Sequence, residues 1–163
     1  MNCIAAVDSA WSIGRNGKLL ASIPADMKFF RNMTMGRVVI MGRKTLESFP
    51  KKQPLAGRVN IVLTSDRDYK VPGAVVVHSV EEAIEAASGY ASEDVFVIGG
   101  GKVYRDMLPF CDTAYITKIH YTYDADTSFP DLDSDSGWYL AEQGEEQTCF
   151  DLIYEFDVYK RVR

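Results

Sequence analysis

Residues 94–107 read DVFVIGGGKVYRDM, and this stretch decides the fold class. Its first part, 94–100, is almost continuously apolar, which is typical of a strand buried on both faces. The glycines that follow lead directly into a helical pattern that we expect over about 101–107. A buried strand that turns through glycines into a helix is the repeating unit of α/β proteins with a parallel sheet.

The glycines of this turn have two interpretations. Gly99, Gly100 and Gly101 would let the backbone approach a pyrophosphate at the start of the helix. Tight packing of the helix on the strand explains them equally well, because Tyr104 stands where a GxGxxG pattern needs its third glycine. The motif by itself leaves both interpretations open.

The same alternation of strand and helix runs through most of the chain. We expect buried strands at 3–8, 37–42, 58–65, 74–79 and 94–100, helices at 25–34, 43–48 and 101–107, a capped helix after Ser79 with Glu82 three residues on, and a long loop from Ser9 to about Pro24. After Pro109 the runs 114–123 and 148–162 are long and rich in β-branched and aromatic residues, which predicts an antiparallel edge. In the second run, one face should carry Phe150, Leu152, Tyr154, Phe156 and Val158.

These elements predict an α/β fold with a mostly parallel central sheet, an antiparallel C-terminal edge and helices on both faces. The 163 residues fit a single domain, which we expect to span 1–163. A ligand should then bind beyond the carboxyl ends of the parallel strands.

The composition restricts the function classes. The net charge is 18 − 23 = −5, which argues against a nucleic-acid surface. The N-terminal segment shows no signal peptide, and no apolar run approaches the ~20 residues of a membrane span. Cys3, Cys111 and Cys149 are far apart and odd in number, which favours a reduced, cytoplasmic protein. His78 and His120 are isolated, so we expect no metal site. We also expect a monomer.

Basic and hydroxyl side chains stand at two further strand ends, and one arginine stands at a strand start. In MGRKT (41–45), Arg43 and Lys44 oppose the helix dipole, and a bound phosphate would remove that penalty. The alternative is that the two residues are simply a solvated basic pair. Thr64 and Ser65 could donate to a phosphate or simply start a turn. Arg58 could clamp a carboxylate with two parallel bonds, although a lone arginine is more often solvated.

One carboxylate lies in an apolar setting. In LLASIPADMKFF (19–30), Asp26 follows Pro24 and precedes two phenylalanines. In the first turn of a helix an acid is favoured by the dipole, which is the simpler interpretation. In an apolar pocket its pKa would rise, and it could then act as an acid near neutral pH.

Taken together, these motifs resemble one family. WSIGRNGKLL, IPADMKFF, VVIMGRKTLES, PLAGRVNIVLTS, VFVIGGGKVY and DTSFPD occur in the order and spacing of dihydrofolate reductases. The resemblance covers nearly the whole chain, and VIMGRKT and IGGGKVY at their separation are specific markers. It implies reduction of dihydrofolate to tetrahydrofolate with NADPH as cofactor, a place in one-carbon metabolism and thymidylate synthesis, and binding of antifolate inhibitors.

The resemblance also implies roles for individual residues. Asp26 corresponds to the acid of the pterin pocket, and Thr117 to the threonine linked to it. The positions that correspond to substrate-binding residues are Ile4, Ala5, Met27, Phe30, Phe49, Leu55, Arg58 and Ile98. The positions that correspond to cofactor-binding residues are Ala6, Ile13, Gly14, Leu19, Gly42, Arg43, Lys44, Thr45, Thr64, Ser65, Gly99, Gly100, Gly101, Lys102, Val103 and Tyr104.

The chain departs from the family at one place, and two other functions compete. The family usually reads L-P-W ahead of the acid, whereas this chain has Leu19-Leu20-Ala21, which leaves open how the proton is delivered. A reductase of the same scaffold that acts on a ribityl-pyrimidine is one alternative, and Arg58 together with Asp26 argues against it. A nucleotide-binding module without turnover is the other, and the presence of Asp26, Thr117 and Arg58 argues against that.

Overall fold

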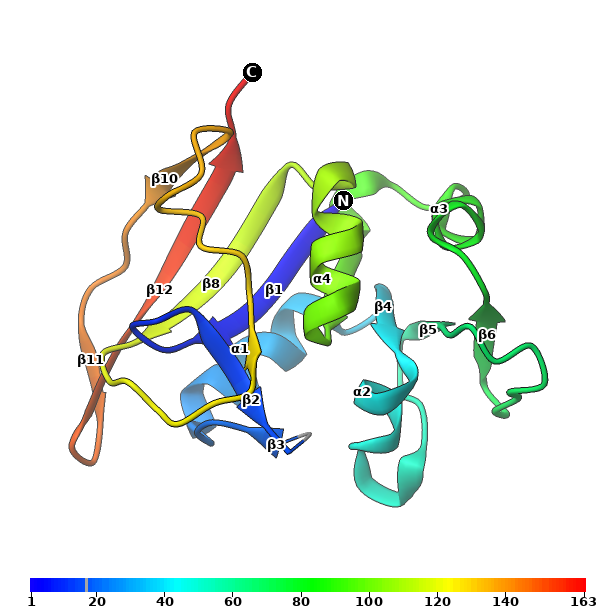
Figure 1. The fold of residues 1–163 in the computed structure, drawn as a ribbon, viewed down its shortest axis with the longest axis horizontal. Helices are drawn as coiled ribbons and strands as arrows, with labels where there is room; N and C mark the ends of the chain where they lie inside the picture. Colours follow the sequence, from blue (N-terminus) through cyan, green and yellow to red (C-terminus); the bar gives the residue numbers. More distant parts are fainter. Residues whose placement is uncertain (17) are drawn as a thin grey trace.

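A large twisted sheet forms the centre of the computed structural model, which describes residues 1–16 and 18–163. Its strands follow the order β10-β12-β8-β1-β7-β4-β5-β6, and β11 pairs with β12 (Figure 1). The strands are β1 (Asn2–Val7), β4 (Val38–Gly42), β5 (Val59–Leu63), β6 (Ala74–Val77), β7 (Val95–Gly99), β8 (Thr113–Ile119), β10 (Trp138–Glu142), β11 (Gln147–Cys149) and β12 (Leu152–Arg161). A small second sheet has the order β3-β2-β9, formed by β2 (Ser12–Arg15), β3 (Lys18–Leu19) and β9 (Thr127–Ser128).

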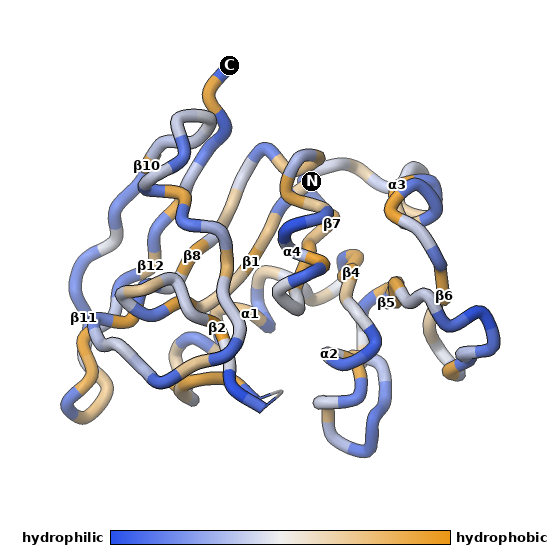
Figure 2. Tube along the Cα trace, in the orientation of Figure 1, coloured by the Kyte–Doolittle hydropathy of each residue, from blue (hydrophilic) through white to orange (hydrophobic). Residues whose placement is uncertain are grey.

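The pairing directions confirm the predicted architecture. From β8 through β1, β7, β4 and β5 to β6 every pair is parallel. At the other edge, β12 pairs antiparallel with β8, β10 and β11. The parallel strands are apolar along their length because both of their faces are covered, and Figure 2 shows apolar residues along strands such as β4 and polar residues in the outer loops.

The helices lie on both faces of the sheet. On one face, α1 (Pro24–Thr34) packs through Phe29, Phe30 and Met33, and α2 (Arg43–Glu47) packs through Leu46. The other face carries α3 (Val80–Ala87) and α4 (Gly101–Met107). Within residues 1–16 and 18–163, three short 3-10 turns, Pro50–Lys52, Ser92–Asp94 and Leu108–Phe110, complete the regular structure.

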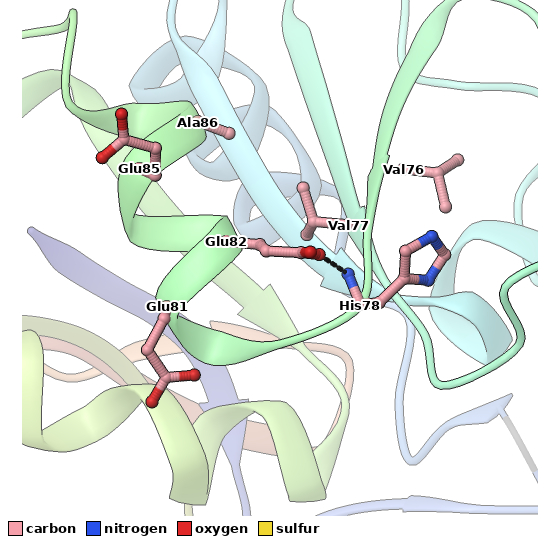
Figure 3. A pocket seen from close by; sticks show the side chains of 7 residues that line it. All are labelled: Val76, Val77, His78, Glu81, Glu82, Glu85 and Ala86. Carbon is pink, nitrogen blue, oxygen red and sulfur yellow. Dashed lines mark hydrogen bonds between the residues drawn. The ribbon is translucent and has the colours of Figure 1, made fainter.

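Helix α3 begins where the sequence predicts a cap. The Ser79 hydroxyl accepts a hydrogen bond from the Glu82 backbone N–H at 3.1 Å. The Glu82 carboxylate in turn accepts from the backbone N–H of His78 at 2.5 Å, as drawn in Figure 3. Two backbone donors at the helix start are therefore satisfied by side chains, which is the physical purpose of a capping box.

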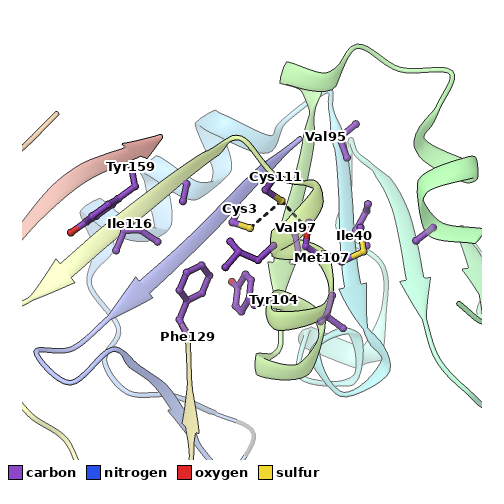
Figure 4. Packing of buried hydrophobic residues seen from close by; sticks show 14 of the residues in the cluster. Cys3, Ile40, Val95, Val97, Tyr104, Met107, Cys111, Ile116, Phe129 and Tyr159 are labelled. Carbon is purple, nitrogen blue, oxygen red and sulfur yellow. Dashed lines mark hydrogen bonds between the residues drawn. The ribbon is translucent and has the colours of Figure 1, made fainter. Parts of the chain in front are cut away.

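The core on the α3 and α4 face contains two of the three cysteines (Figure 4). Cys3 and Cys111 are buried, and their sulfur atoms lie 3.3 Å apart. The hydrogen bond between the two thiols and their burial raise the pKa of Cys3 well above its ordinary value. All three cysteines are free thiols.

The structure corrects several predicted elements. The run 148–162 is a hairpin of β11 and β12, because Phe150 turns the chain with a φ of 53° and is 99% exposed. The strand predicted at 114–123 ends at Ile119. The predicted loop at 9–24 contains β2 and β3, and β9 and β10 are strands that were not predicted. The strands missed outside the main sheet are two to four residues long, too short to show an alternating apolar pattern.

Candidate active site

The carboxyl ends of β1, β4, β5 and β7 meet at one edge of the sheet, because these strands are parallel. Helix α2 follows β4 directly at this edge, and α4 follows β7 after one residue. The small β3-β2-β9 sheet lies toward the same end of the molecule (Figure 1). This is the edge at which a ligand of an open α/β sheet binds.

Asp26 and Thr117 lie together although they are far apart in sequence. The Thr117 hydroxyl, on β8, donates to Asp26 Oδ1 in the first turn of α1 at 2.6 Å. Burial raises the pKa of the Asp26 carboxyl, and the hydrogen bond from Thr117 partly opposes this rise. The Oδ1 atom is thereby fixed, and the acid is held in a setting that favours its protonated form.

An apolar cluster contains most of the residues predicted to bind substrate. The buried Ile4 of β1 and the partly buried Phe30, Phe49, Leu55 and Ile98 belong to the same cluster. Met27, predicted to share this apolar wall, is instead 56% exposed and lies outside the cluster. Phe29, Phe30 and Met33 form the side of α1 that faces the sheet, and Met27 is not among the residues that pack there.

Two small residues of β1 lie on opposite sides of the sheet. Ala5 packs against the core on the α3 and α4 face, and Ala6 packs with Ile23, Ile119 and Tyr154. Ala21, which stands where the family usually has tryptophan, is part of this second, smaller cluster. The segment before Asp26 is thus anchored by apolar contacts of modest size.

Arg58 directly precedes β5, and no carboxylate of the described residues forms an ion pair with it. Its Nη1 donates to Thr34 Oγ1 at 3.2 Å, and its Nε donates to the Ala56 carbonyl at 3.0 Å. Burial, and then the charge of Arg31, lower the pKa of the Arg58 guanidinium. Neither arginine takes part in an ion pair within residues 1–16 and 18–163, so the two positive charges lie near each other without a compensating acid.

The glycine turn brings the starts of α2 and α4 together. A β-carbon at Gly42 would lie 3.1 Å from Val103 Cγ2 and 4.0 Å from the Gly100 nitrogen. Gly99 has a φ of +133°, which side-chain-bearing residues rarely adopt. Thr45 points toward this turn, since a β-carbon at Gly99 would lie 3.4 Å from its hydroxyl. Bare backbone at two adjacent helix starts fits a dinucleotide pyrophosphate.

The remaining members of the predicted cofactor set lie around this turn. Gly101, Lys102, Val103 and Tyr104 form the first turn of α4, and the buried Tyr104 hydroxyl donates to the Ile4 carbonyl at 2.7 Å. Burial raises the pKa of Tyr104 well above its ordinary value, so it acts as a neutral donor. Lys44 is exposed on α2, and Lys102 extends along its own helix to Asp106 at 2.8 Å.

The other residues predicted to bind the cofactor lie after β5 and in the small sheet. Thr64 and Ser65 follow β5 directly. Ile13 and Gly14 belong to β2, and Leu19 of β3 is 72% exposed.

Comparison with known proteins identifies the family. The sequence model described as dihydrofolate reductase matches residues 1–161. The chain belongs to the dihydrofolate reductase family. It is 40% identical to dihydrofolate reductase of Bacillus subtilis over 160 residues, which covers 97% of this chain and 92% of the relative. It is 38% identical to dihydrofolate reductase of Neisseria gonorrhoeae over 144 residues, which covers 88% and 86%.

A solved structure of the same family matches the fold. Dihydrofolate reductase from Enterococcus faecalis, complexed with NADP(H) and RAB-propyl, superposes with a TM-score of 0.87 at 37% identity. The match covers 99% of this chain and 96% of that one. The fold and the family derived from the residues are therefore confirmed.

Sequence reasoning missed the residues that hold the dihydrofolate reductase loops in place. Buried Asp8 accepts backbone hydrogen bonds from Ala10, Ser12 and Tyr123 at 2.9 Å each. Asp126 likewise accepts from the Asn16 N–H at 2.9 Å. The segment around β2 and the segment before β9 are thus tied together by carboxylates, which only the fold could reveal.

The hollow in Figure 3 lies elsewhere on this dihydrofolate reductase fold. It sits between the end of β6 and α3, and Glu81, Glu82 and Glu85 line it. Three carboxylates repel a phosphate-bearing cofactor, so this hollow is not the dinucleotide site. In the described part of the chain, no group of three or more metal-ligating side chains is placed to hold a metal, and no helix is long and apolar enough to cross a membrane.

Proposed function

We propose that the chain reduces 7,8-dihydrofolate to 5,6,7,8-tetrahydrofolate with NADPH, and that Asp26 and Thr117 handle the proton that the reaction requires. Membership of the dihydrofolate reductase family and the likeness to a structure complexed with NADP(H) support the reaction. The observation that carries the role of Asp26 is its 2.6 Å hydrogen bond from Thr117 inside a partly buried, apolar setting.

NADPH supplies the hydride, and the protein must supply a proton to a pterin ring nitrogen. Thr117 donates to Asp26 Oδ1, and Oδ2 would be the oxygen that serves the substrate. Because burial raises the pKa of Asp26, the carboxyl retains a proton at higher pH than an exposed aspartate does. It can therefore act as the proton donor, directly or through a water.

The substrate would lie on the apolar cluster with its charged end at Arg58. Ile4, Phe30 and Ile98 provide an apolar surface suited to the pterin, while Phe49 and Leu55 are suited to the aminobenzoyl ring. Arg58, unpaired by any carboxylate of the described residues, is suited to a bidentate bond with the substrate's carboxylate. Ala5 follows Ile4 on β1 but packs on the other side of the sheet, and Met27 would reach the pterin only from an exposed position.

The cofactor would cross from the pterin to the edge of β5. The pyrophosphate fits the backbone at Gly42 and Gly99–Gly101, with Thr45 beside it. Arg43 and Lys44, with Thr64 and Ser65, are suited to the adenosine 2′-phosphate. Lys102, bound to Asp106 on its own helix, would add charge from α4.

The setting of the enzyme is also a proposal. A net charge of −5 and free thiols at Cys3, Cys111 and Cys149 support a monomer in the cytoplasm that binds small molecules, antifolate inhibitors included, rather than nucleic acid.

One assay tests the reaction against its alternatives. Purified protein is mixed with NADPH and 7,8-dihydrofolate, and the loss of reduced-nicotinamide absorbance is followed while tetrahydrofolate is identified by chromatography. Turnover with dihydrofolate and none with a ribityl-aminopyrimidine is the expected result. Turnover of the pyrimidine alone would indicate the related reductase, and NADPH binding without any turnover would indicate a binding module.

A further inference from the structure

Arg43 is held by three side chains before any cofactor arrives. Its Nε lies 3.3 Å from Glu47 Oε1, one turn along α2. Its Nη1 lies 3.1 Å from Asp66 Oδ2, in the loop after β5. Its guanidinium stands over the Tyr69 ring, 4.5 Å from the centroid. One positive charge therefore faces two negative charges, and the guanidinium cannot swing freely.

Asp66 is fixed in its turn by local hydrogen bonds. Its backbone N–H donates to Thr64 Oγ1 at 3.2 Å, and its Oδ1 accepts from the Asp68 N–H at 3.0 Å. The Thr64 N–H is bound to the Val77 carbonyl at 3.0 Å, which ties the loop to the sheet. The Oδ1 atom is thus occupied by the turn, and Oδ2 is left directed at Arg43.

This arrangement places an acid in the same loop as the hydroxyls of Thr64 and Ser65 and on the same guanidinium that would receive a phosphate. We propose that Asp66 is a specificity-determining residue, whose carboxylate competes with the adenosine 2′-phosphate for Arg43 and so limits the preference for NADPH over NADH. The inference rests on the proposed function, in that it requires Arg43 to bind the 2′-phosphate.

Charge explains the direction of the effect. A 2′-phosphate that approaches Arg43 must approach Asp66 as well, and like charges at this range repel. NADH carries no phosphate there and experiences little of this repulsion. The Arg43 and Asp66 side chains are 41% and 45% exposed, so solvent and salt screen the interaction, and its size is moderate.

Two matched substitutions separate charge from structure. Asp66→Asn keeps an oxygen for the Asp68 N–H and removes the charge. Asp68→Asn removes the same charge two residues away, where the structure shows a backbone bond but no ion pair within the described residues. Arg43→Ala tests whether the guanidinium senses the phosphate at all.

Isothermal titration calorimetry measures the dissociation constants of adenosine 2′,5′-bisphosphate and adenosine 5′-phosphate, and their ratio is the preference for the 2′-phosphate. The ratio of kcat/KM for NADPH to kcat/KM for NADH measures the same preference in the reaction. Asp66→Asn should raise the preference for the 2′-phosphate about fivefold, the scale of one partly exposed charge interaction. Asp68→Asn should change it less than about twofold. The Asp66→Asn effect should be clearly smaller in the Arg43→Ala background, where the competition for Arg43 is lost and only the screened repulsion of the phosphate remains.

Each other outcome has a definite meaning. If Asp66→Asn leaves the ratio unchanged or lowers it while Arg43→Ala reduces it, Asp66 only positions Arg43 and the inference is overturned. If Arg43→Ala leaves the ratio unchanged, the proposed 2′-phosphate site is wrong, and the inference falls with it. An equal rise with Asp68→Asn would show a diffuse field effect and would also overturn the role of Asp66.

Discussion

At the scale of single residues, the Thr117 hydroxyl and the Asp26 carboxyl, 2.6 Å apart, are the groups suited to proton chemistry. Thr117 is only 2% exposed, so its hydrogen bond to Asp26 is shielded from competing water. Burial favours the protonated acid, and the hydrogen bond favours the ionised one. Burial is the larger of the two effects, so the pKa rises, which is the direction that a proton donor requires.

The Asp26→Asn variant tests this role. An amide keeps the shape and can still pair with Thr117, but it cannot give up a proton. Dihydrofolate turnover should fall on the order of 10²-fold or more, the usual scale for a general acid. Single-turnover hydride transfer across pH is the measurement: the wild-type rate should fall as pH rises through the Asp26 pKa, and the variant's rate should lose this step.

NADPH binding is the control for the Asp26→Asn variant, because the acid lies on the pterin side of the proposed site. Its dissociation constant should barely change. Wild-type rates at neutral pH in the variant would return Asp26 to the simpler interpretation of a helix-start carboxylate.

Two neighbouring acids lie on one face of β12, opposite to Tyr154 and Phe156. Glu155 and Asp157 are both buried, and one oxygen of each has no hydrogen-bond partner within the described chain. Glu155 binds His120 at 2.7 Å, while Asp157 accepts from the Gly144 N–H at 3.1 Å and lies 3.9 Å from Lys118, which is itself bound to Asp133. Burial and the neighbouring Glu155 raise the pKa of Asp157 to about 6.

Asp157 should therefore make stability depend on pH. Its folded pKa of about 6 exceeds its ordinary 3.8, so the folded state binds the proton more tightly, and stability should fall as pH rises between these values. Glu155, whose pKa is lowered, contributes stability that is lost only at lower pH. Thermal unfolding from pH 4.5 to 7.5 should show the Asp157 effect.

The Asp157→Asn variant isolates that effect. Its amide can donate to the partnerless Glu155 oxygen and still accept from Gly144. At pH 7.5 its Tm should exceed the wild-type Tm by roughly 2–4 °C, equivalent to about 1 kcal/mol, and the difference should vanish toward pH 4.5. A difference of the same size at both pH values would contradict the titration of this group.

At the scale of elements, the start of α3 shows how local sequence fixes a boundary. The helix is short, and its two fully buried residues, Ala83 and Ala87, are small. The cap formed by Ser79 and Glu82 therefore contributes a large share of what holds its first turn.

Removal of the Ser79 hydroxyl should destabilise the protein. Ser79→Ala should lower the free energy of unfolding by about 1 kcal/mol, because the Glu82 N–H loses its partner. Denaturant unfolding measures this value. Ser88→Ala, at the other end of α3, loses a hydroxyl bonded to a carbonyl at 2.7 Å and should cost less. An equal loss for both variants would show that the N-cap has no special weight.

At the scale of the whole molecule, the proposed site joins distant parts of the sheet. Asp26 and Thr117 lie beside the β1–β8 half, and Gly42, Arg43 and Thr64 lie beside the β4–β5 half. A dinucleotide that contacts both halves binds only the folded chain, so it stabilises the fold by mass action.

NADPH should accordingly raise the melting temperature. At 100 times its dissociation constant it should add about 2.7 kcal/mol, which corresponds to roughly 5–10 °C for a chain of this size. NADH at the same concentration should give a smaller shift, because it lacks the phosphate that Arg43 would bind. Equal shifts from the two cofactors at this concentration would contradict a 2′-phosphate site. Differential scanning fluorimetry is sufficient for the comparison.

The alternation of strands and helices, the capped start of α3, the glycine turn and the family could all be predicted from the sequence, because each depends on neighbouring residues or on ordered motifs. Which side chains meet became visible only in the folded structure. Thr117 and Asp26 are separated by 91 positions, and Arg43 and Asp66 by 23, so no local pattern predicts their contact. The tertiary structure also decided the hairpin at Phe150 and the small β3-β2-β9 sheet, because strands this short depend on their partners for stability.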